Sequence, residues 1–312
     1  MRAVADGAET SLAGTRVLVT GASGLIGSHL LHVLDSAAEV VAVSRLGRPS
    51  ERGVRWIVCD LARPGAIADV VEAERPQVII HLAGAVRGDR SLEAVGPTLR
   101  VNLVVTVELL EAATRVGCRR IVLSGSLLEE PATGTPQAVP PSPYGASRWA
   151  ASAYARMFHA LFETPVAVLR PSYAYGPSQE QSKLIPFVTT ALLAGESPHL
   201  SSGQRKLDWV YAEDVARAYN AAASRPGIEG RTLDVGSGNM ASVDEVVRAI
   251  GEAVGPTAGT PRFGAVPIRP LEQDVVPDIE ETAAALGWRA TTSLEEGLNR
   301  TVAWIRDQRL AG

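Results

Sequence analysis

The sequence contains little cysteine, almost no lysine and no long apolar run, and each shortage excludes a class of protein. Only two cysteines, Cys59 and Cys118, occur in 312 residues. Both stand beside expected strands, so we expect small buried side chains in a reducing, cytoplasmic compartment and not a disulfide framework. No apolar run reaches the roughly 18 residues of a membrane span, and Met1 to Leu12 lack the basic start and apolar core of a signal peptide.

The chain also has no excess of positive charge. The formal net charge is −4 at pH 7, which leaves no basic footprint and argues against nucleic acid as a partner. Lysine occurs only at Lys183 and Lys206, and every other strongly basic residue is arginine. Hydrophobic residues make up 46% of the chain and charged residues 21%, which is typical of a globular protein with one large or two modest domains.

Short apolar runs rich in β-branched residues alternate with helical patterns in the first half of the chain. The strand-like runs are 16–20, 40–44, 55–59, 78–82, 120–124 and 166–170, and the helical patterns are 29–34, 67–73, 102–116 and 146–161. This alternation predicts an α/β fold, a doubly wound parallel sheet with helices on both faces. Ligands of such sheets bind at the carboxyl ends of the strands.

The pattern changes after Arg170. Segments rich in glycine, proline and serine separate shorter helical stretches at 185–193, 243–254 and 294–305. We therefore expect a dinucleotide-binding domain at residues 13–170, to which residues 208–238 return, and a smaller α/β substrate domain formed by residues 171–207 and 239–312.

A glycine-rich turn joins the first strand to the first helix. Gly21, Gly24 and Gly27 recur every third residue there. Their missing side chains allow a tight turn and the close approach of a pyrophosphate, and the start of the helix offers N–H groups and a partial positive charge. The predicted cofactor contacts are Gly21, Ser23, Gly24, Leu25, Ile26 and Gly27.

The end of the second strand indicates which nucleotide binds. It reads Ser44-Arg45, with no carboxylate where an NAD site usually holds the ribose hydroxyls. Arg45, with Arg48 close behind, suits a 2′-phosphate because guanidinium groups form charge-assisted bonds with phosphate oxygens. We predict NADP, with NAD less favoured; the alternative is a solvated arginine after a strand. Asp60, followed by Leu61, is placed either to bind the adenine edge or to cap the next helix.

Other residues near the strand ends are assigned more simply. The fourth strand ends in the small residues of 82–84, Leu82, Ala83 and Gly84, beside which a cofactor fits closely. His81 is interpreted as a packed core residue, and no spacing of His, Cys and Asp suggests a metal. The acidic residues interpreted as solvated charges are Glu129, Glu130, Asp278, Glu280 and Glu281.

Three residues in the middle of the chain suit hydride transfer to a carbonyl, which needs a group that protonates the developing alkoxide. The proline-rich residues 140–143 fit an extended entry, and a helix is expected to begin near Tyr144. Arg148 follows four residues later on the same helical face, and a cation beside a phenol favours the ionised form. Ser126 follows a strand and offers a hydroxyl to the substrate carbonyl.

Several motifs occur in a fixed order along the chain. They are 20–27 (TGASGLIG), 81–84 (HLAG), Asn102 at the head of an expected helix, the serine-containing stretch 124–126, 144–148 (YGASR), 169–177 (LRPSYAYGP) and 208–215 (DWVYAEDV). From Thr15 to Ile305 the chain resembles the extended short-chain dehydrogenases/reductases of the nucleotide-sugar epimerase, dehydratase and reductase group. The resemblance implies a Rossmann-type fold, a carbonyl-binding role for Ser126, proton transfer by Tyr144, and a ribose contact for Arg148.

The resemblance also assigns binding residues. Cofactor contacts fall on Asn102 and Pro171, and substrate contacts on Tyr173, Lys183, Arg205 and Arg269. Lys183 and Arg269 stand where the family contacts the nucleotide diphosphate. Tyr173 replaces an asparagine common in the family, and Arg205 is close to Leu207, where many members have an arginine.

Two departures from the family pattern bear on the reaction. The family has lysine where this chain has Arg148; arginine is planar, bulkier and always protonated, and we interpret it as a working replacement in a chain that uses arginine almost throughout. Leu127 and Leu128 stand where related 4,6-dehydratases have an Asp-Glu pair, so elimination lacks its acid and base and a dehydratase is disfavoured.

The sequence therefore favours NADPH-dependent reduction of a keto group, at C4, of a nucleotide-linked deoxysugar. The alternatives are a nucleotide-sugar 4-epimerase with tightly bound NAD, a non-catalytic NADP-binding sensor, and a reductase of small ketones or aldehydes. The expected helices at 102–116 and 146–161 carry apolar residues on more than one face. In this family such helices pair between subunits, so a homodimer is expected.

Overall fold

The main sheet of the protein contains seven parallel strands. The computed structural model describes residues 11–49, 53–86, 88–129, 139–256, 258–268, 271 and 274–311. The strands are β1 (Arg16–Thr20), β2 (Glu39–Ser44), β3 (Arg55–Val58), β4 (Val78–His81), β5 (Arg120–Ser124), β6 (Val166–Pro171) and β9 (Thr232–Val235). Their order is β3-β2-β1-β4-β5-β6-β9, so the winding reverses between β1 and β4, the place where doubly wound sheets bind ligands.

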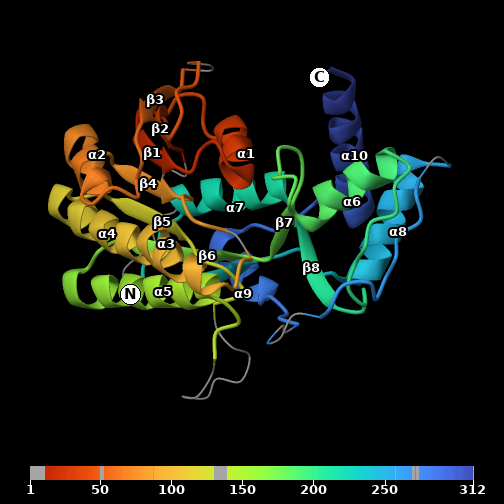
Figure 1. Ribbon diagram of the computed structural model, residues 1–312. Helices are drawn as coiled ribbons and strands as arrows, with labels where there is room; N and C mark the ends of the chain where they lie inside the picture. The colour runs from red at the N-terminus through yellow and green to blue at the C-terminus, as the bar shows by residue number, and fades with distance from the viewer. Residues whose placement is uncertain are drawn as a thin grey trace.

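Helices cover both faces of this sheet (Figure 1). On one face lie α1 (Leu25–Val33) and α7 (Ala212–Ser224), and on the other lie α2 (Ala66–Glu74), α4 (Val105–Val116) and α5 (Pro143–Phe162). All six strand-like runs of the sequence are strands of this sheet. The predicted doubly wound α/β architecture is confirmed.

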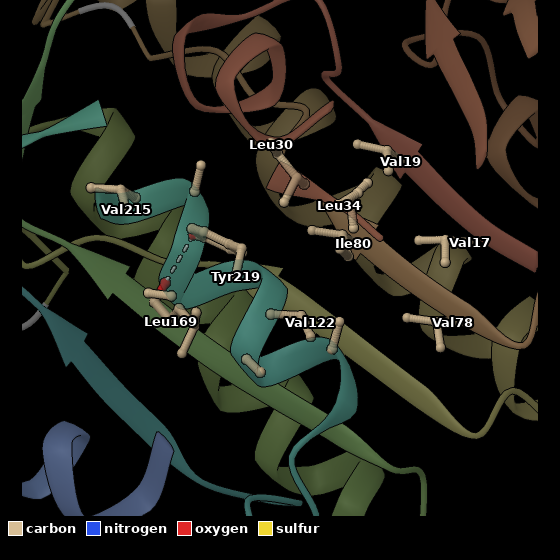
Figure 2. Packing of buried hydrophobic residues seen from close by; sticks show 14 of the residues in the cluster. Val17, Val19, Leu30, Leu34, Val78, Ile80, Val122, Leu169, Val215 and Tyr219 are labelled. Atoms are coloured by element: carbon tan, nitrogen blue, oxygen red, sulfur yellow. Dashed lines mark hydrogen bonds between the residues drawn. The ribbon is translucent and has the colours of Figure 1, made fainter. Parts of the chain in front are cut away.

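The strand side chains alternate between two hydrophobic cores, because successive residues of a strand point to opposite faces. In β1, Val17 and Val19 pack into the core beneath α1 and α7, whereas Leu18 packs into the core beneath α2, α4 and α5. Figure 2 shows the first of these cores, where Leu30 of α1 and Tyr219 of α7 meet the strands. Burial on both faces explains why the strands are nearly continuous apolar runs in the sequence.

A second sheet, in the order β10-β8-β7, lies beside the first (Figure 1). Its strands are β7 (Tyr173–Tyr175), β8 (Lys206–Tyr211) and β10 (Met240–Ser242), and the helices packed with it are α6 (Leu184–Leu193), α8 (Val243–Val254) and α10 (Leu294–Ala311). They enclose a third core, to which the three helices give Val188, Val247 and Leu298. Beyond β7 the chain alternates between the two sheets. Strand β8 belongs to the small sheet, while α7, β9 and α9 (Ile279–Leu286) lie with the main sheet.

The helix expected at 102–116 begins earlier than the sequence suggested. A 3-10 turn, η1 (Leu92–Ala94), leads into α3 (Val95–Leu99), and a π-helical turn, η2 (Arg100–Val104), connects α3 to α4. Pro97 is tolerated because a proline in the first turn lacks only an N–H that has no helical partner. Asn102 therefore lies within the π turn and not at the head of a helix.

Both cysteines are buried and unpaired, with exposed fractions of 7% for Cys59 and 5% for Cys118. Burial raises the pKa of the Cys118 thiol to about 12, so this thiol stays protonated near neutral pH. The interpretation of both residues as small buried side chains is confirmed. Within the described ranges, no helix is long and apolar enough to cross a membrane.

Candidate active site

The loops that follow the strands of the main sheet meet at one edge, because all seven strands run in the same direction. The glycine turn follows β1, Arg45 follows β2, and residues 82–84 follow β4. Ser126 lies two residues past the end of β5, and Pro171 ends β6. The topology thus brings residues that are far apart in the sequence to a single edge.

The backbone of the glycine turn is packed too tightly for side chains at two of its three glycines. Gly21 has a φ of +68°, and a Cβ there would lie 2.6 Å from the backbone nitrogen of Ala83. A Cβ at Gly27 would lie 2.3 Å from the carbonyl oxygen of Gly21. Gly24 precedes α1, and no side chain caps this helix. The first amides of α1 are left without a side-chain partner, an arrangement that suits a phosphate group.

The end of β2 presents two arginines to solvent. Ser44 is buried, with an exposed fraction of 7%, whereas Arg45 and Arg48 are exposed. The guanidinium carbon of Arg48 lies 5.8 Å from the centre of the Trp56 ring, within the range of a cation–π contact. Both arginines are therefore accessible to solvent, and Arg48 also contacts Trp56.

Asp60 follows β3 and is exposed. Its carboxylate accepts the N–H of Ala62 at 3.1 Å, which closes a local turn, and Leu61 packs into the core beneath α2. The cap position of α2 is occupied by Gly65. The interpretation of Asp60 as the cap of the next helix is therefore wrong, and a contact with adenine stays a prediction.

His81 ends β4 and is completely buried. Its Nδ1 lies 2.7 Å from Thr20 Oγ1 and its Nε2 lies 3.5 Å from Thr106 Oγ1. Burial, and in second place the charge of Arg148, lower the pKa of His81 to about 3. The imidazole is therefore neutral near neutral pH, and its interpretation as a packed core residue is confirmed.

Asn102 connects the loop after β4 to α5. It is completely buried. Its Oδ1 accepts the N–H of Ala85 at 2.8 Å, and its Nδ2 donates to Ser147 Oγ at 3.1 Å. A Cβ at Gly84 would lie 3.0 Å from the same Oδ1. The asparagine thus fixes the loop after β4 at Ala85, next to the small residues 82–84, from within the protein.

The helix that carries Tyr144 begins where the sequence predicted. Ser142 caps α5 by accepting the N–H of Gly145 at 3.1 Å, and a proline occupies the first helical position. A Cβ at Gly145 would lie 2.5 Å from the carbonyl oxygen of Leu128. The first turn of α5 therefore packs directly on the loop that carries Ser126.

Arg148 is 2% exposed and reaches back to the ends of β4 and β5. Its Nη1 donates to the carbonyl oxygen of Ser124 at 2.6 Å, and its guanidinium carbon lies 5.7 Å from the centre of the Tyr144 ring. A Cβ at Gly84 would lie 1.9 Å from Nη2, so the guanidinium occupies the space that this glycine leaves. The Nε is buried and has no hydrogen-bond partner among the described residues.

Ser126 stands in a tight turn after β5 and is 7% exposed. Its Oγ accepts the N–H of Leu128 at 3.1 Å, so the hydroxyl proton remains for another acceptor. The N–H of Leu127 donates to the carbonyl oxygen of Pro171 at 3.3 Å. The turn is therefore fixed against the end of β6.

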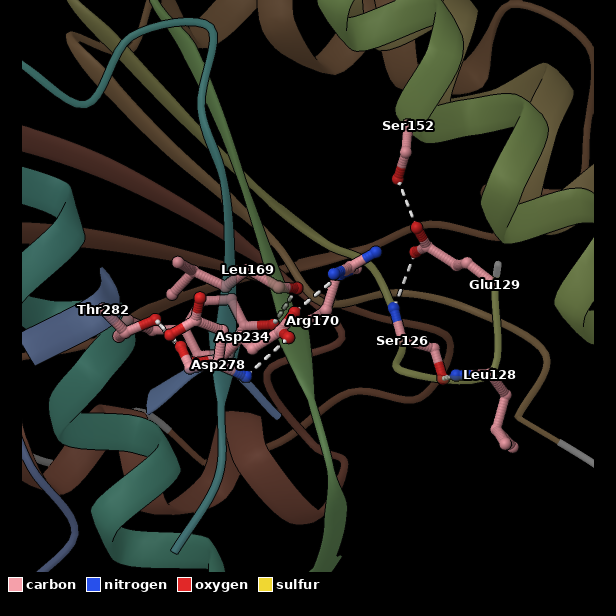
Figure 3. A network of polar contacts seen from close by, with 10 residues as sticks. Ser126, Leu128, Glu129, Ser152, Leu169, Arg170, Asp234, Asp278 and Thr282 are labelled. Atoms are coloured by element: carbon pink, nitrogen blue, oxygen red, sulfur yellow. Dashed lines mark hydrogen bonds and ion pairs between the residues drawn. The ribbon is translucent and has the colours of Figure 1, made fainter. Parts of the chain in front are cut away.

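The structure contradicts the interpretation of Glu129 as a solvated charge. Glu129 is 1% exposed, and its carboxyl group accepts the N–H of Ser126 at 2.6 Å and the O–H of Ser152 at 2.8 Å (Figure 3). Burial raises its pKa to about 7. Two consecutive acidic residues in a loop are usually solvated, which is why the sequence did not indicate burial here. The one local sign is Gly125, whose missing side chain leaves space for the carboxyl group of Glu129. Glu130 lies outside the described residues.

The substrate residues expected in the second half of the chain come together only in part. Arg205 donates to the hydroxyl of Tyr173 at 2.8 Å, and its guanidinium carbon lies 5.5 Å from the Tyr173 ring centre, because β7 and β8 are paired strands. Lys183 precedes α6, and its Nζ donates to the carbonyl oxygen of Val86 in the loop after β4. Arg269 lies outside the described residues.

A doubly wound sheet with a glycine turn, a serine, a tyrosine and a buried cation at one edge defines an NAD(P)-dependent oxidoreductase of the short-chain dehydrogenase/reductase type. The family model described as the NAD dependent epimerase/dehydratase family matches residues 17–236, and the chain belongs to this family. The resemblance inferred from the motifs is confirmed.

Individual relatives agree with this assignment. The chain is 30% identical to the UDP-glucose 4-epimerase of Mycolicibacterium smegmatis over 94% of this chain and 99% of that protein. It is 31% identical to the dTDP-glucose 4,6-dehydratase of Actinoplanes sp. over 94% of this chain and 98% of that protein. The solved structure of MoeE5 in complex with UDP-glucose and NAD is similar with a TM-score of 0.82 at 32% identity, over 94% of this chain and 99% of that chain.

Proposed function

We propose that the protein reduces a keto group, at C4, of a nucleotide-linked deoxysugar with NADPH. The observation that carries this proposal is the arrangement of Ser126, Tyr144 and Arg148. The first turn of α5 packs on the Ser126 loop, and the buried guanidinium lies 5.7 Å from the Tyr144 ring. Two hydroxyl groups and a fixed positive charge therefore share the edge at which the cofactor loops end.

The residues at this edge fit a dinucleotide. The uncapped start of α1 after Gly24 suits the pyrophosphate, and the unpartnered Nε of Arg148 leaves a buried donor for a ligand. The residues proposed to hold the cofactor are Gly21, Ser23, Gly24, Leu25, Ile26, Gly27, Ser44, Arg45, Asp60, Leu61, Leu82, Ala83, Gly84, Asn102, Tyr144, Arg148 and Pro171. When bound, the nicotinamide supplies the hydride.

The side chains of this chain then handle the proton and the charge. Ser126 donates its hydroxyl proton in a hydrogen bond to the substrate oxygen, and Tyr144 delivers the proton that this oxygen needs as it becomes an alcohol. Arg148 holds the ribose and places a positive charge beside the phenol. On the substrate side we propose that Tyr173, Lys183, Arg205 and Arg269 contact the nucleotide diphosphate.

The reaction is tested by following NADPH absorbance with a nucleotide-linked 4-keto-6-deoxyhexose as substrate. We expect one NADPH to be consumed for each sugar that is reduced. Turnover of the sugar without net consumption of NADPH would contradict the reductase and favour the second candidate below.

The cofactor preference depends on Arg45. Replacing Arg45 with aspartate should reverse the preference from NADPH to NADH, because a carboxylate repels the 2′-phosphate and accepts bonds from the ribose hydroxyls. A charge-assisted bond contributes roughly 1.5–3 kcal/mol, so we expect the NADPH Kd to rise about tenfold to a hundredfold. Fluorescence titration with both nucleotides measures it.

A charge change elsewhere serves as the control for this experiment. Arg115 is exposed at the carboxyl-terminal end of α4, away from the edge that carries Arg45. Arg115→Asp alters the net charge equally and should leave both Kd values unchanged. An unaltered nucleotide preference in Arg45→Asp would refute a 2′-phosphate contact.

The second candidate is a nucleotide-sugar 4-epimerase with tightly bound NAD. It is favoured by the relative from Mycolicibacterium smegmatis, a UDP-glucose 4-epimerase that matches over nearly the whole of both chains. An epimerase oxidises and reduces the same carbon in turn. It would purify with NAD⁺ and interconvert two sugars with no net change in absorbance.

Dehydration is a less suitable function, although dehydratases are among the relatives. Leu127 and Leu128 provide no acid or base after Ser126. The next acidic residue, Glu129, directs its carboxyl group to the backbone of Ser126 and to Ser152 of α5. It is therefore engaged behind the loop and not offered to the substrate.

We also propose a homodimer formed through α3, α4 and α5. Large apolar side chains are exposed on η1, on α3 and at the end of α5, namely Leu92 (83%), Leu99 (45%), Leu161 (68%) and Phe162 (54%). Burying them between two subunits removes apolar surface from water. Light scattering should give twice the chain mass of 32.8 kDa for the unmodified protein, and Leu161→Glu should lower it toward the mass of a single chain. Leu310→Glu, at an 82% exposed position on α10, is the control that should leave the mass unchanged.

A further inference from the structure

A buried carboxyl group closes the Ser126 turn from behind (Figure 3). One oxygen of Glu129 accepts the N–H of Ser126 at 2.6 Å. The backbone N–H of Glu129 donates in return to the carbonyl oxygen of Ser126 at 3.1 Å. The two ends of the turn are thus held together by one backbone bond and one side-chain bond.

The same carboxyl group connects this turn to the helix that carries the other two residues of the site. Its second oxygen accepts the O–H of Ser152 at 2.8 Å. Ser152 follows Arg148 by four residues and Tyr144 by eight, so the three lie along one side of α5. Glu129 is therefore a direct link between the Ser126 turn and the residues of α5.

The protein has room for this carboxyl group because residue 125 is a glycine. A Cβ at Gly125 would lie 2.3 Å from Glu129 Oε1 and 2.9 Å from Val168 Cγ1. No side chain could occupy this place without displacing the carboxyl group or the strand beside it. The position of Glu129 is thus defined by packing as well as by hydrogen bonds.

Charged and titratable groups surround Glu129 on three elements. Arg148 on α5 and Arg170 on β6 both stabilise its ionised form. Arg170 is itself paired with Asp234 of β9, with 2.7 Å between Nε and Oδ1. From α7, the phenol of Tyr219 faces the same region; burial raises its pKa, and the charge of Glu129 adds to the effect. Two guanidinium groups therefore offset part of the effect of burial, which still raises the pKa of Glu129.

We propose that Glu129 is a positioning residue: its carboxylate locks the Ser126 turn against α5, so that Ser126 Oγ and Tyr144 approach the same substrate oxygen. The choice of reaction rests on the proposed function. The contacts of Glu129 with Ser126 and Ser152 do not depend on which reaction is catalysed, and they are tested separately.

The kinetic test is Glu129→Gln, alone and combined with Ser126→Ala. Displacing a reacting group by about 1 Å can cost about 10²-fold in rate, so we expect kcat to fall about tenfold to a hundredfold with little change in KM. In the Ser126→Ala background the same substitution should cost almost nothing, because the residue through which Glu129 acts is already removed. Equal losses in both backgrounds would overturn the proposal.

Two further variants separate positioning from a general loss of stability. Ser152→Ala removes only the bond to α5 and should lower kcat in the same direction by a smaller factor. Asp214 is a matched control, since it is 2% exposed and also accepts one backbone N–H, from Thr292, and one hydroxyl, from Thr291. Asp214→Asn should leave kcat unchanged. A loss in Asp214→Asn equal to that in Glu129→Gln would overturn the proposal.

The direct test needs no turnover. In an NMR spectrum of protein labelled with carbonyl ¹³C in glycine and ¹⁵N in serine, only serines that follow a glycine are selected, which are Ser28, Ser126 and Ser237. The signal that is missing from Ser126→Ala is that of Ser126. A carboxylate is a stronger acceptor than a carboxylic acid. The pKa of Glu129 is raised to about 7. As the pH rises and Glu129 ionises, the chemical shift of the Ser126 amide proton should therefore move downfield, with a midpoint near pH 7.

The change of signal with pH should be absent in Glu129→Gln and unaltered in Asp214→Asn. A Ser126 signal that does not respond to pH, or responds equally in Glu129→Gln, would overturn the link. If the signal responds as expected but no keto sugar is turned over, the proposed function fails and the contact stands. If turnover occurs and the signal does not respond, the positioning role fails and the function stands.

Discussion

Replacing Tyr144 with phenylalanine should lower kcat by about 10²–10⁴-fold, the range that a positioned proton donor contributes. The ring would be retained, and with it the contact with the Arg148 guanidinium at 5.7 Å. Only the phenolic hydroxyl group would be lost. We therefore expect the free energy of unfolding to stay close to that of the unmodified protein.

A second tyrosine of the same helix provides the control. Tyr154 lies on α5 and is 42% exposed. Tyr154→Phe removes an equivalent hydroxyl from the same element and should leave kcat unchanged. Full turnover in Tyr144→Phe, measured by NADPH consumption, would be fatal to the proposed mechanism.

The second large effect concerns Gly84, whose missing side chain makes room for Arg148. A methyl group at this position would lie 1.9 Å from Nη2 of Arg148 and 3.0 Å from Oδ1 of Asn102. Gly84→Ala should therefore displace the guanidinium, lower kcat/KM about a hundredfold, and reduce the free energy of unfolding by about 1–3 kcal/mol, as overpacking does. Steady-state kinetics and denaturant titration measure the two effects.

The decisive comparison places Gly84→Ala in an Arg148→Lys background. Lysine has no planar fork at the end of its side chain, so no second nitrogen would meet the new methyl group. Gly84→Ala should cost much less there than in the unmodified protein. Gly96→Ala on α3 is the control, because a Cβ at Gly96 would have no neighbour within 4 Å. Equal losses in both backgrounds would show that Arg148 does not need the space at Gly84.

Much of the architecture was predictable because it depends on local patterns. All strands of the main sheet except the edge strand β3 are largely buried on both faces, so each appears in the sequence as a short apolar run with β-branched residues. The glycine turn was recognisable from its spacing, and the start of α5 from Ser142 and the proline that follows it. The shorter strands, such as β7 and β10, give too few residues for a pattern to appear.

The arrangement of the site was less predictable, for a different reason. Glu129 carries no local sign of burial except Gly125, four residues earlier, and its partner Ser152 is 23 residues further along the chain. The same holds for Arg148, whose side chain depends on the space left at Gly84. In each case the environment of a charged residue is supplied by an element distant in the sequence.

The sequence by itself determined that this protein has a doubly wound sheet, a glycine turn for a dinucleotide, and a tyrosine and an arginine on one helical face. These features depend on residues within a few positions of one another. Only the tertiary structure decided that the carboxyl group of Glu129 is buried behind Ser126 and that Arg148 occupies the space beside Gly84. Burial of a charge is decided by what packs around it, and in this fold that packing comes from separate strands and from α5.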